Sequence, residues 1–244
     1  MGYDLQDFTL SDALRCGAEL RRIIETASSV ESAAQAITQS IYETFTNDST
    51  SESSCALVRC YKTHSFNELP PDLQGFARNV LKRKPASPRV KCLTLMGSRG
   101  DRPEWNDRTR SLGHQAIPLE TVEMVEQAPM VFQLIRQLGL DVAEVVAPTP
   151  ELMRKVVGKS YGVFYVPRAK GSPFIPAQSE FVIAENIQSV VGFGGLLRNG
   201  DMLAVVLFSR TPISEQTANR FKTLALDVRA ALFSAGHLPA FQPA

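Results

Sequence analysis

The chain has 244 residues, of which 44% are hydrophobic and 21% charged, and its formal net charge is +1. A chain of this size can bury a substantial core, and we predict a single domain over residues 1–244. Basic and acidic residues are interspersed, and Lys82-Arg83-Lys84 is too short for the basic stripe that nucleic acid requires, so we expect no nucleic-acid partner. No apolar stretch approaches the roughly 20 residues of a membrane span, and an N-terminus with Asp4 and Asp7 does not resemble a signal peptide. We therefore expect a cytoplasmic protein without a membrane partner.

The N-terminal quarter predicts two helices followed by a strand. Thr9-Leu-Ser-Asp12 and Ser28-Ser-Val-Glu31 resemble capping boxes, which place the helices at about 11–26 and 31–45. A polar loop over residues 46–54 follows. The apolar run Cys55-Ala-Leu-Val-Arg-Cys-Tyr61 then predicts a strand.

The middle of the chain predicts short helices and strands separated by long loops. Pro70-Pro71-Asp72 indicates a helix that ends near Lys82, because proline is tolerated in the first helical turn. A strand over 90–96 precedes a charged loop over 97–118, which holds Trp105, the only tryptophan. Beyond this loop the patterns predict a helix over 121–138 that is divided at Pro129, and then an apolar run over 142–146. They next predict a helix that begins near Thr149-Pro150, a strand over 163–166 and a second, proline-rich loop over 167–178.

The last quarter gives the clearest local pattern. Two apolar runs within residues 189–209 flank Asn199-Gly200, the dipeptide that most readily forms a type I′ hairpin turn. Residues 213–232 then carry a helical apolar stripe with Ser214 as the N-cap. The chain is therefore predicted to end with a hairpin and a helix.

These helices, strands and glycine-containing hairpin together resemble a GAF-type sensory domain of the bacterial signal-transduction class. The resemblance covers nearly the whole chain and implies an α+β fold, in which N- and C-terminal helices flank a central antiparallel sheet. Residues 98–178 would then be an elaborated region of inserted helices and lid loops. The resemblance also implies a small-molecule ligand or a protein partner such as a kinase, and a homodimer formed through the terminal helices.

The cysteines do not have the pattern of a disulfide framework, and the sequence identifies no cofactor. Cys16, Cys55, Cys60 and Cys92 include no CxxC pair, and we expect them to be small buried core residues. Because Cys55 and Cys60 are five residues apart on one strand, we expect them to point to opposite faces. Within the GAF class, no cysteine adjoins a histidine as in bilin-binding members, and the Asn-Lys start of the cyclic-nucleotide signature is absent. The methionine sulfoxide reductase branch needs cysteines in loops, whereas these four lie in predicted strands and a helix.

A ligand pocket, if present, is expected between one face of the sheet and the two long loops. The candidates are aromatic side chains that can stack on a flat or apolar ligand, with a cationic or imidazole group for its polar end. They are Arg110, His114, Tyr161, Tyr165, Phe174, Phe181 and Phe193. We expect Trp105 and Phe174 to fold onto the sheet beside Phe193 and Tyr165. The alternative is ordinary core packing, since strand-spaced aromatics mostly face the interior.

Two classes of function remain open at this stage. The first is a non-catalytic regulatory domain that signals through its terminal helices. The second is a small-molecule enzyme with its site between the 97–118 loop and the aromatic strands. His64 is expected in a turn, and three dispersed histidines do not predict a zinc site. No catalytic residue is predicted.

Overall fold

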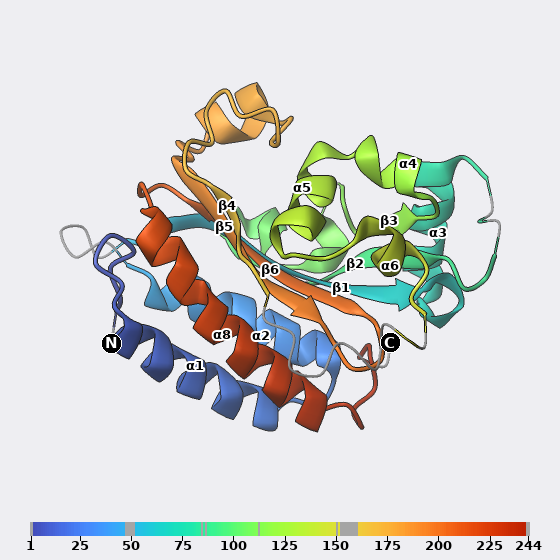
Figure 1. The fold of residues 1–244 in the computed structure, drawn as a ribbon, viewed down its shortest axis with the longest axis horizontal. Helices are drawn as coiled ribbons and strands as arrows, with labels where there is room; N and C mark the ends of the chain where they lie inside the picture. Colours follow the sequence, from blue (N-terminus) through green and yellow to red (C-terminus); the bar gives the residue numbers. More distant parts are fainter. Residues whose placement is uncertain are drawn as a thin grey trace.

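The computed structural model describes residues 2–46, 52–83, 85, 87–111, 113–149, 151 and 161–242. Its centre is an antiparallel sheet of six strands in the order β3-β2-β1-β6-β5-β4. The strands are β1 (Cys55–Ser65), β2 (Lys91–Gly100), β3 (Ala116–Leu119), β4 (Phe164–Val166), β5 (Ser189–Leu196) and β6 (Met202–Ser209). The sheet lies between two helical layers, which confirms the predicted α+β class (Figure 1).

One face of the sheet is covered by the terminal helices α1 (Leu10–Glu25), α2 (Val30–Thr44) and α8 (Glu215–Ser234). Their starts follow from capping: the side chains of Thr9, Ser29 and Ser214 each accept a hydrogen bond from a first-turn backbone N–H. The stripe predicted for the last helix is buried against the sheet. Phe221 of α8 packs on Phe193 of β5, with 5.7 Å between ring centroids.

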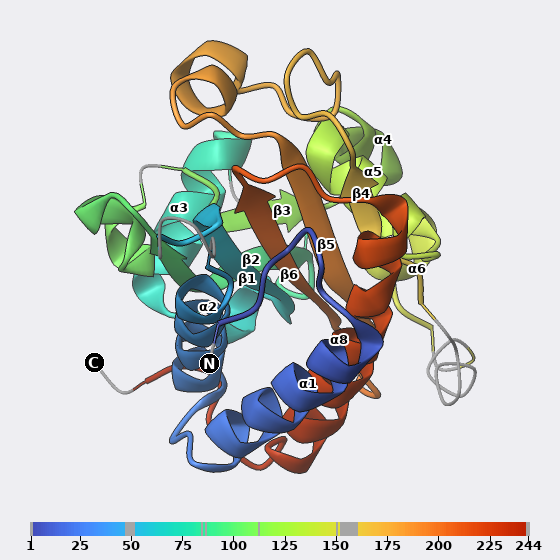
Figure 2. The ribbon, with the colours of Figure 1, turned by 90° about the vertical axis from the view of Figure 1, so that its left-hand side faces the viewer.

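Helices α1 and α8 lie side by side in both views (Figures 1 and 2). Arg21 of α1 forms an ion pair of 2.7 Å with Asp227 of α8. Gly17 allows this close approach, because a Cβ at that position would lie 1.9 Å from the Asp227 carboxylate oxygen. The two terminal helices therefore form one packed layer.

The opposite face is covered by α4 (Val122–Glu126), α5 (Pro129–Gln137) and α6 (Val142–Val146), together with a π-helical segment over Gln178–Ile183. Proline at the first position of α5 divides the predicted 121–138 helix, as expected. The helix α3 (Pro71–Leu81) packs near β3 over a third, smaller cluster. The helix predicted to begin near residue 150 lies outside the described residues.

Three local predictions are wrong, and each has a physical reason. Strand β1 continues to Ser65, so His64 lies in a strand and not in a turn. A bulge shifts the β1–β6 register between Cys55 and Leu57, and Cys55 and Cys60 consequently pack into the same core cluster. The loop after β2 is also shorter than expected, because β2 runs to Gly100 and β3 begins at Ala116.

The hairpin between β5 and β6 is present, but its turn is not type I′. Gly200 has a positive φ of 82°, whereas Asn199 does not share that conformation. The N–H of Gly200 donates to the carbonyl of Leu197, and the N–H of Leu197 donates to the carbonyl of Asp201. This is a turn followed by a left-handed glycine, the pattern of a bulged hairpin loop. It leaves the Asn199 side chain free to bond to Asp201.

Across the described ranges, no helix combines the length and the apolar composition that crossing a membrane requires.

Candidate functional site

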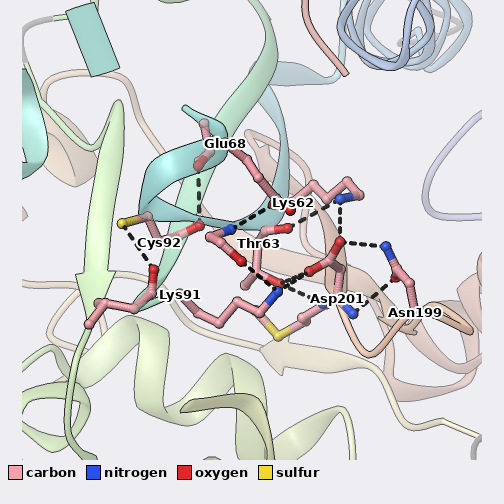
Figure 3. Close-up of polar contacts among 11 residues, drawn as sticks. Lys62, Thr63, Glu68, Lys91, Cys92, Asn199 and Asp201 are labelled. Carbon is pink, nitrogen blue, oxygen red and sulfur yellow. Dashed lines mark hydrogen bonds and ion pairs between the residues drawn. The ribbon is translucent and has the colours of Figure 1, made fainter. Parts of the chain in front are cut away.

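The most unusual polar group in the described core is a carboxylate held by two lysines. Asp201, immediately before β6, is 4% exposed and contacts Lys62 of β1 at 2.6 Å and Lys91 of β2 at 2.8 Å (Figure 3). The side chains of both lysines are also largely withdrawn from solvent, at 9% and 15% exposure. One negative charge therefore faces two positive charges in a poorly solvated site, an arrangement that leaves an excess positive charge.

The hairpin turn and β1 position this carboxylate. The amide of Asn199 donates to Asp201 at 2.7 Å, and the hydroxyl of Thr63 lies 3.4 Å from its other oxygen. Thr63 also accepts a hydrogen bond from the N–H of Met202, which joins β1 to β6 at this point. Burial raises the pKa of Asp201, but the ammonium groups of Lys62 and Lys91 outweigh burial, so the pKa lies below its ordinary value. Asp201 is therefore ionised at neutral pH.

His64 is a further polar residue at this end of β1. It is 3% exposed, and Phe241 from the C-terminal segment covers its ring at a centroid distance of 5.1 Å. Among the residues that the structure describes, its Nε2 has no hydrogen-bond partner. Burial and the nearby charge of Lys62 lower the pKa of His64 to about 3. The imidazole is therefore neutral at physiological pH and has an unused polar atom.

These groups form the floor of a cavity of about 1050 Å³. Lys62, His64 and Asp201 are its most buried polar lining residues, while Leu226 and Phe233 of α8 line it from more exposed positions. The cavity thus has a polar floor and an apolar rim, the combination typical of small-molecule sites. Its lining contains more cationic than acidic side chains: Lys62, Lys91, Arg198 and Arg229 against Glu68 and Asp201.

The C-terminal segment closes one side of the cavity. The N–H groups of Val30 and Glu31, at the start of α2, donate to the carbonyls of Pro239 and Ala240, each at 3.0 Å. The N–H of Gln242 donates to the Glu31 carboxylate at 2.8 Å. These bonds fasten residues 239–242 across the end of α2, with Phe241 over His64.

The structure places five of the seven candidates from the sequence on the two faces of the sheet and the other two in a loop. Phe193 packs in the core beneath the terminal helices, and the Tyr165 hydroxyl donates to the carbonyl of Ile213 beside them. Phe174 and Phe181 instead pack against the opposite core, as does the buried Tyr161, whose ring lies 4.3 Å from the guanidinium of Arg229. The two remaining candidates, Arg110 and His114, are exposed in the loop between β2 and β3.

The expected position of the tryptophan is wrong. Trp105 contacts Phe181 edge to face, with 5.7 Å between ring centroids, and lies on the opposite face from Phe193. Phe174 packs against that opposite core as well. Trp105 follows β2 by five residues and folds back over Gly100, where a Cβ would lie 2.8 Å from the indole ring, so its ring joins the core under α4–α6.

The cysteines are buried and unpaired, as predicted. Burial raises the pKa of Cys55 and Cys60 to about 12, which keeps both thiols protonated and poorly nucleophilic at neutral pH. Within the described parts of the chain, no group of three His, Cys, Asp or Glu side chains is placed to hold a metal ion.

Comparison with known proteins identifies the fold alone. No family model and no curated protein matches the chain. Among solved structures it is similar to a free methionine-R-sulfoxide reductase from Neisseria meningitidis, with 11% identity, a TM-score of 0.50, and coverage of 93% of this chain and 90% of that one. The chain has a GAF-type fold. Two GAF domains of phosphoenolpyruvate-protein phosphotransferases are also similar. The domain from Coxiella burnetii has 11% identity and a TM-score of 0.49, with coverage of 93% of this chain and 96% of that one. The domain from Acinetobacter has 16% identity and a TM-score of 0.45, with coverage of 91% of this chain and 93% of that one.

The lysine–aspartate group of this GAF-type domain was not predicted from the sequence. Lys62 and Asp201 are 139 residues apart, and only the pairing of β1 with β6 brings them together. One signal was available: Lys62 and His64 continue the alternation of Val58 and Cys60, so polar side chains occupy core-facing positions. A polar residue at such a position requires a partner or a function.

Proposed function

We propose that this chain is a non-catalytic regulatory domain, which binds a small molecule in the cavity beneath α8 and signals through its terminal helices. The observation that carries the proposal is that α8 provides both the cavity wall and the contact with α1. Leu226, Ala230 and Phe233 line the cavity, while Asp227, in the same turns of the helix, pairs with Arg21 of α1. A ligand that displaces this part of α8 would therefore change the surface that α1 and α8 share.

We further propose that the partner for this surface is a second copy of the chain. Leu10 and Leu14 lie four residues apart on α1 and are 57% and 56% exposed, so they form an apolar strip on one helical face. Exposed Arg15, Glu19 and Arg22 flank the strip with charges of both signs. Such mixed charge suits self-association, because the positive groups of one copy can face the negative groups of the other.

Filling the cavity provides the test. Ala230 is exposed and lines the cavity, so Ala230→Trp is expected to occupy it without disturbing the core. Gln216→Trp is the matched control, because Gln216 is exposed on the same helix but does not line the cavity. In a thermal-shift screen of metabolites, the compounds that raise Tm should do so for the wild type and Gln216→Trp, but not for Ala230→Trp. Hits that persist in Ala230→Trp, or a screen with no hits, would contradict the proposal.

A further inference from the structure

The charges of the cavity floor indicate which class of ligand it takes. Two ammonium groups share the single carboxylate of Asp201, and a buried charge is costly unless it is paired. Lys62 also donates to the carbonyl of Thr63 at 3.2 Å, and Lys91 reaches the hydroxyl of Ser65 only at 3.5 Å. An ammonium group has three N–H donors, so in the described structure each lysine has one donor left for another acceptor.

His64 supplies a second, independent observation. Its side chain lines the same cavity, is more than nine-tenths buried, and has an Nε2 without a partner among the described residues. A buried polar atom without a hydrogen bond destabilises the folded protein, and a ligand that supplies the hydrogen bond recovers that free energy. With Nε2 protonated, the neutral imidazole donates to an anionic oxygen, as the lysines do.

The rim requires an apolar part in the same ligand. Leu226 and Phe233 are 58% and 54% exposed, large values for such side chains on a helix that otherwise buries its apolar stripe. Both line the cavity and are its most exposed large apolar side chains. Arg198 lies 4.2 Å from the centre of the Phe233 ring and adds positive charge at the rim.

Building on the proposed function, we infer that the cavity binds a small organic anion. Its carboxylate or phosphate group lies against Lys62, Lys91 and His64, and its apolar body contacts Leu226 and Phe233. The bound anion neutralises the excess charge beside Asp201 and accepts a hydrogen bond from His64. The apolar body covers the rim of α8. Ligands of the same shape without a negative charge do not neutralise the excess positive charge of Lys62 and Lys91, and therefore bind weakly.

A series of three compounds with one shape tests the charge requirement: 3-phenylpropionate, 3-phenylpropan-1-ol and 3-phenylpropylamine. In calorimetric titrations of the full chain at pH 7.5, the carboxylate should bind at least about tenfold more tightly than the alcohol, and the amine should not bind. Alcohol binding as tight as that of the carboxylate would overturn the inference. If that alcohol binding is lost in Ala230→Trp, the proposed function still holds. If none of the three compounds binds and the metabolite screen gives no hits, both the inferred anion site and the proposed function are overturned.

The role of the lysines is tested separately. Lys91→Met removes one ammonium but leaves the Lys62–Asp201 pair intact, so the variant should fold and bind 3-phenylpropionate at least about tenfold more weakly. Lys222→Met is the control, because it removes the same charge from an exposed position of α8 outside the cavity. Equal affinities for the two variants would contradict the assignment of Lys91.

Nuclear magnetic resonance of the histidine rings gives a readout without any change in the binding floor. The chain has three histidines, and the His64 signals are assigned by their loss in His64→Leu. Titration of the wild type with 3-phenylpropionate should shift the Nε2 signal of His64 and leave unchanged the signals of His114, which does not line the cavity. An unchanged His64 signal at saturation would overturn the contact.

Discussion

Acidification is expected to destabilise the protein through His64, and the direction follows from its burial. Burial, assisted by the nearby charge of Lys62, lowers its pKa from 6.5 to about 3 in the folded state. In the unfolded chain the pKa returns to its ordinary value. Below pH 6.5 the unfolded state therefore binds a proton that the folded state does not, and the stability present above this pH is lost as the pH falls toward 3. Asp201 adds little between pH 7 and pH 5, because its pKa in the unfolded chain is the ordinary 3.8 and its pKa in the folded state is lower still; the stability that it contributes is lost at lower pH.

The magnitude follows from the same two values. A pH of 5 lies 1.5 units below the ordinary pKa of 6.5, so the histidine is mostly protonated in the unfolded chain, whereas it remains neutral in the folded state. Each unit corresponds to about 1.4 kcal/mol, so lowering the pH from 7 to 5 should reduce the free energy of unfolding by about 2 kcal/mol through this residue. This is a large share of the 5 to 15 kcal/mol of a typical domain.

Urea unfolding of the wild type and of His64→Leu at pH 7, 6 and 5 isolates this contribution. The two other histidines are common to both proteins, and their effects cancel in the difference. The wild type should lose about 2 kcal/mol more than the variant between pH 7 and pH 5. Equal losses in the two proteins would refute the burial argument for His64.

Three further predictions concern the charge cluster, the core and the dimer. In urea unfolding, Asp201→Asn should lower the free energy of unfolding by about 3 to 5 kcal/mol, because it leaves two buried ammonium groups without a carboxylate. Lys91→Met should lower it far less, and equal losses for the two variants would contradict the charge pairing. Gly97→Ala should destabilise the protein by more than about 2 kcal/mol, since its Cβ would lie 2.5 Å from the backbone of α2. A Cβ at Gly75 would meet no atom within 4 Å, so Gly75→Ala should stabilise α3 by about 0.5 to 1 kcal/mol. Equal changes in the free energy of unfolding for the two glycine variants would contradict the close packing of Gly97 against α2. Light scattering should show a wild-type dimer and a folded Leu14→Glu monomer, and a wild-type monomer at tens of micromolar would contradict the dimer proposal.

The elements that the sequence predicts well are those with local determinants. Thr9 caps α1 as predicted, whereas Ser29 with Ser32 caps α2 in place of the predicted Ser28 with Glu31, and both helices begin within one residue of the predicted starts. The stripe of α8 and its cap at Ser214 are likewise local patterns. The division of the 121–138 helix needs only Pro129, which cannot continue a helix from the preceding turn.

The errors arise where tertiary contacts decide. Asn199-Gly200 favours a type I′ turn by itself, but the side chain of Asn199 is needed to hold Asp201, and the loop adopts the bulged form. The bulge after Cys55 depends on the register with β6, about 150 residues away. The cavity combines β1, β2, the hairpin and α8, so no contiguous pattern could reveal it.

The proposed ligand site lies on the face beneath α8 and not on the face covered by α4–α6. Hydrogen–deuterium exchange with and without saturating 3-phenylpropionate distinguishes the two faces. Exchange should become slower in residues 226–234 of α8 and in the adjoining helix α1, with no change in residues 101–111 or 167–188. Protection confined to those two loop segments would place the ligand on the opposite face and refute the site beneath α8.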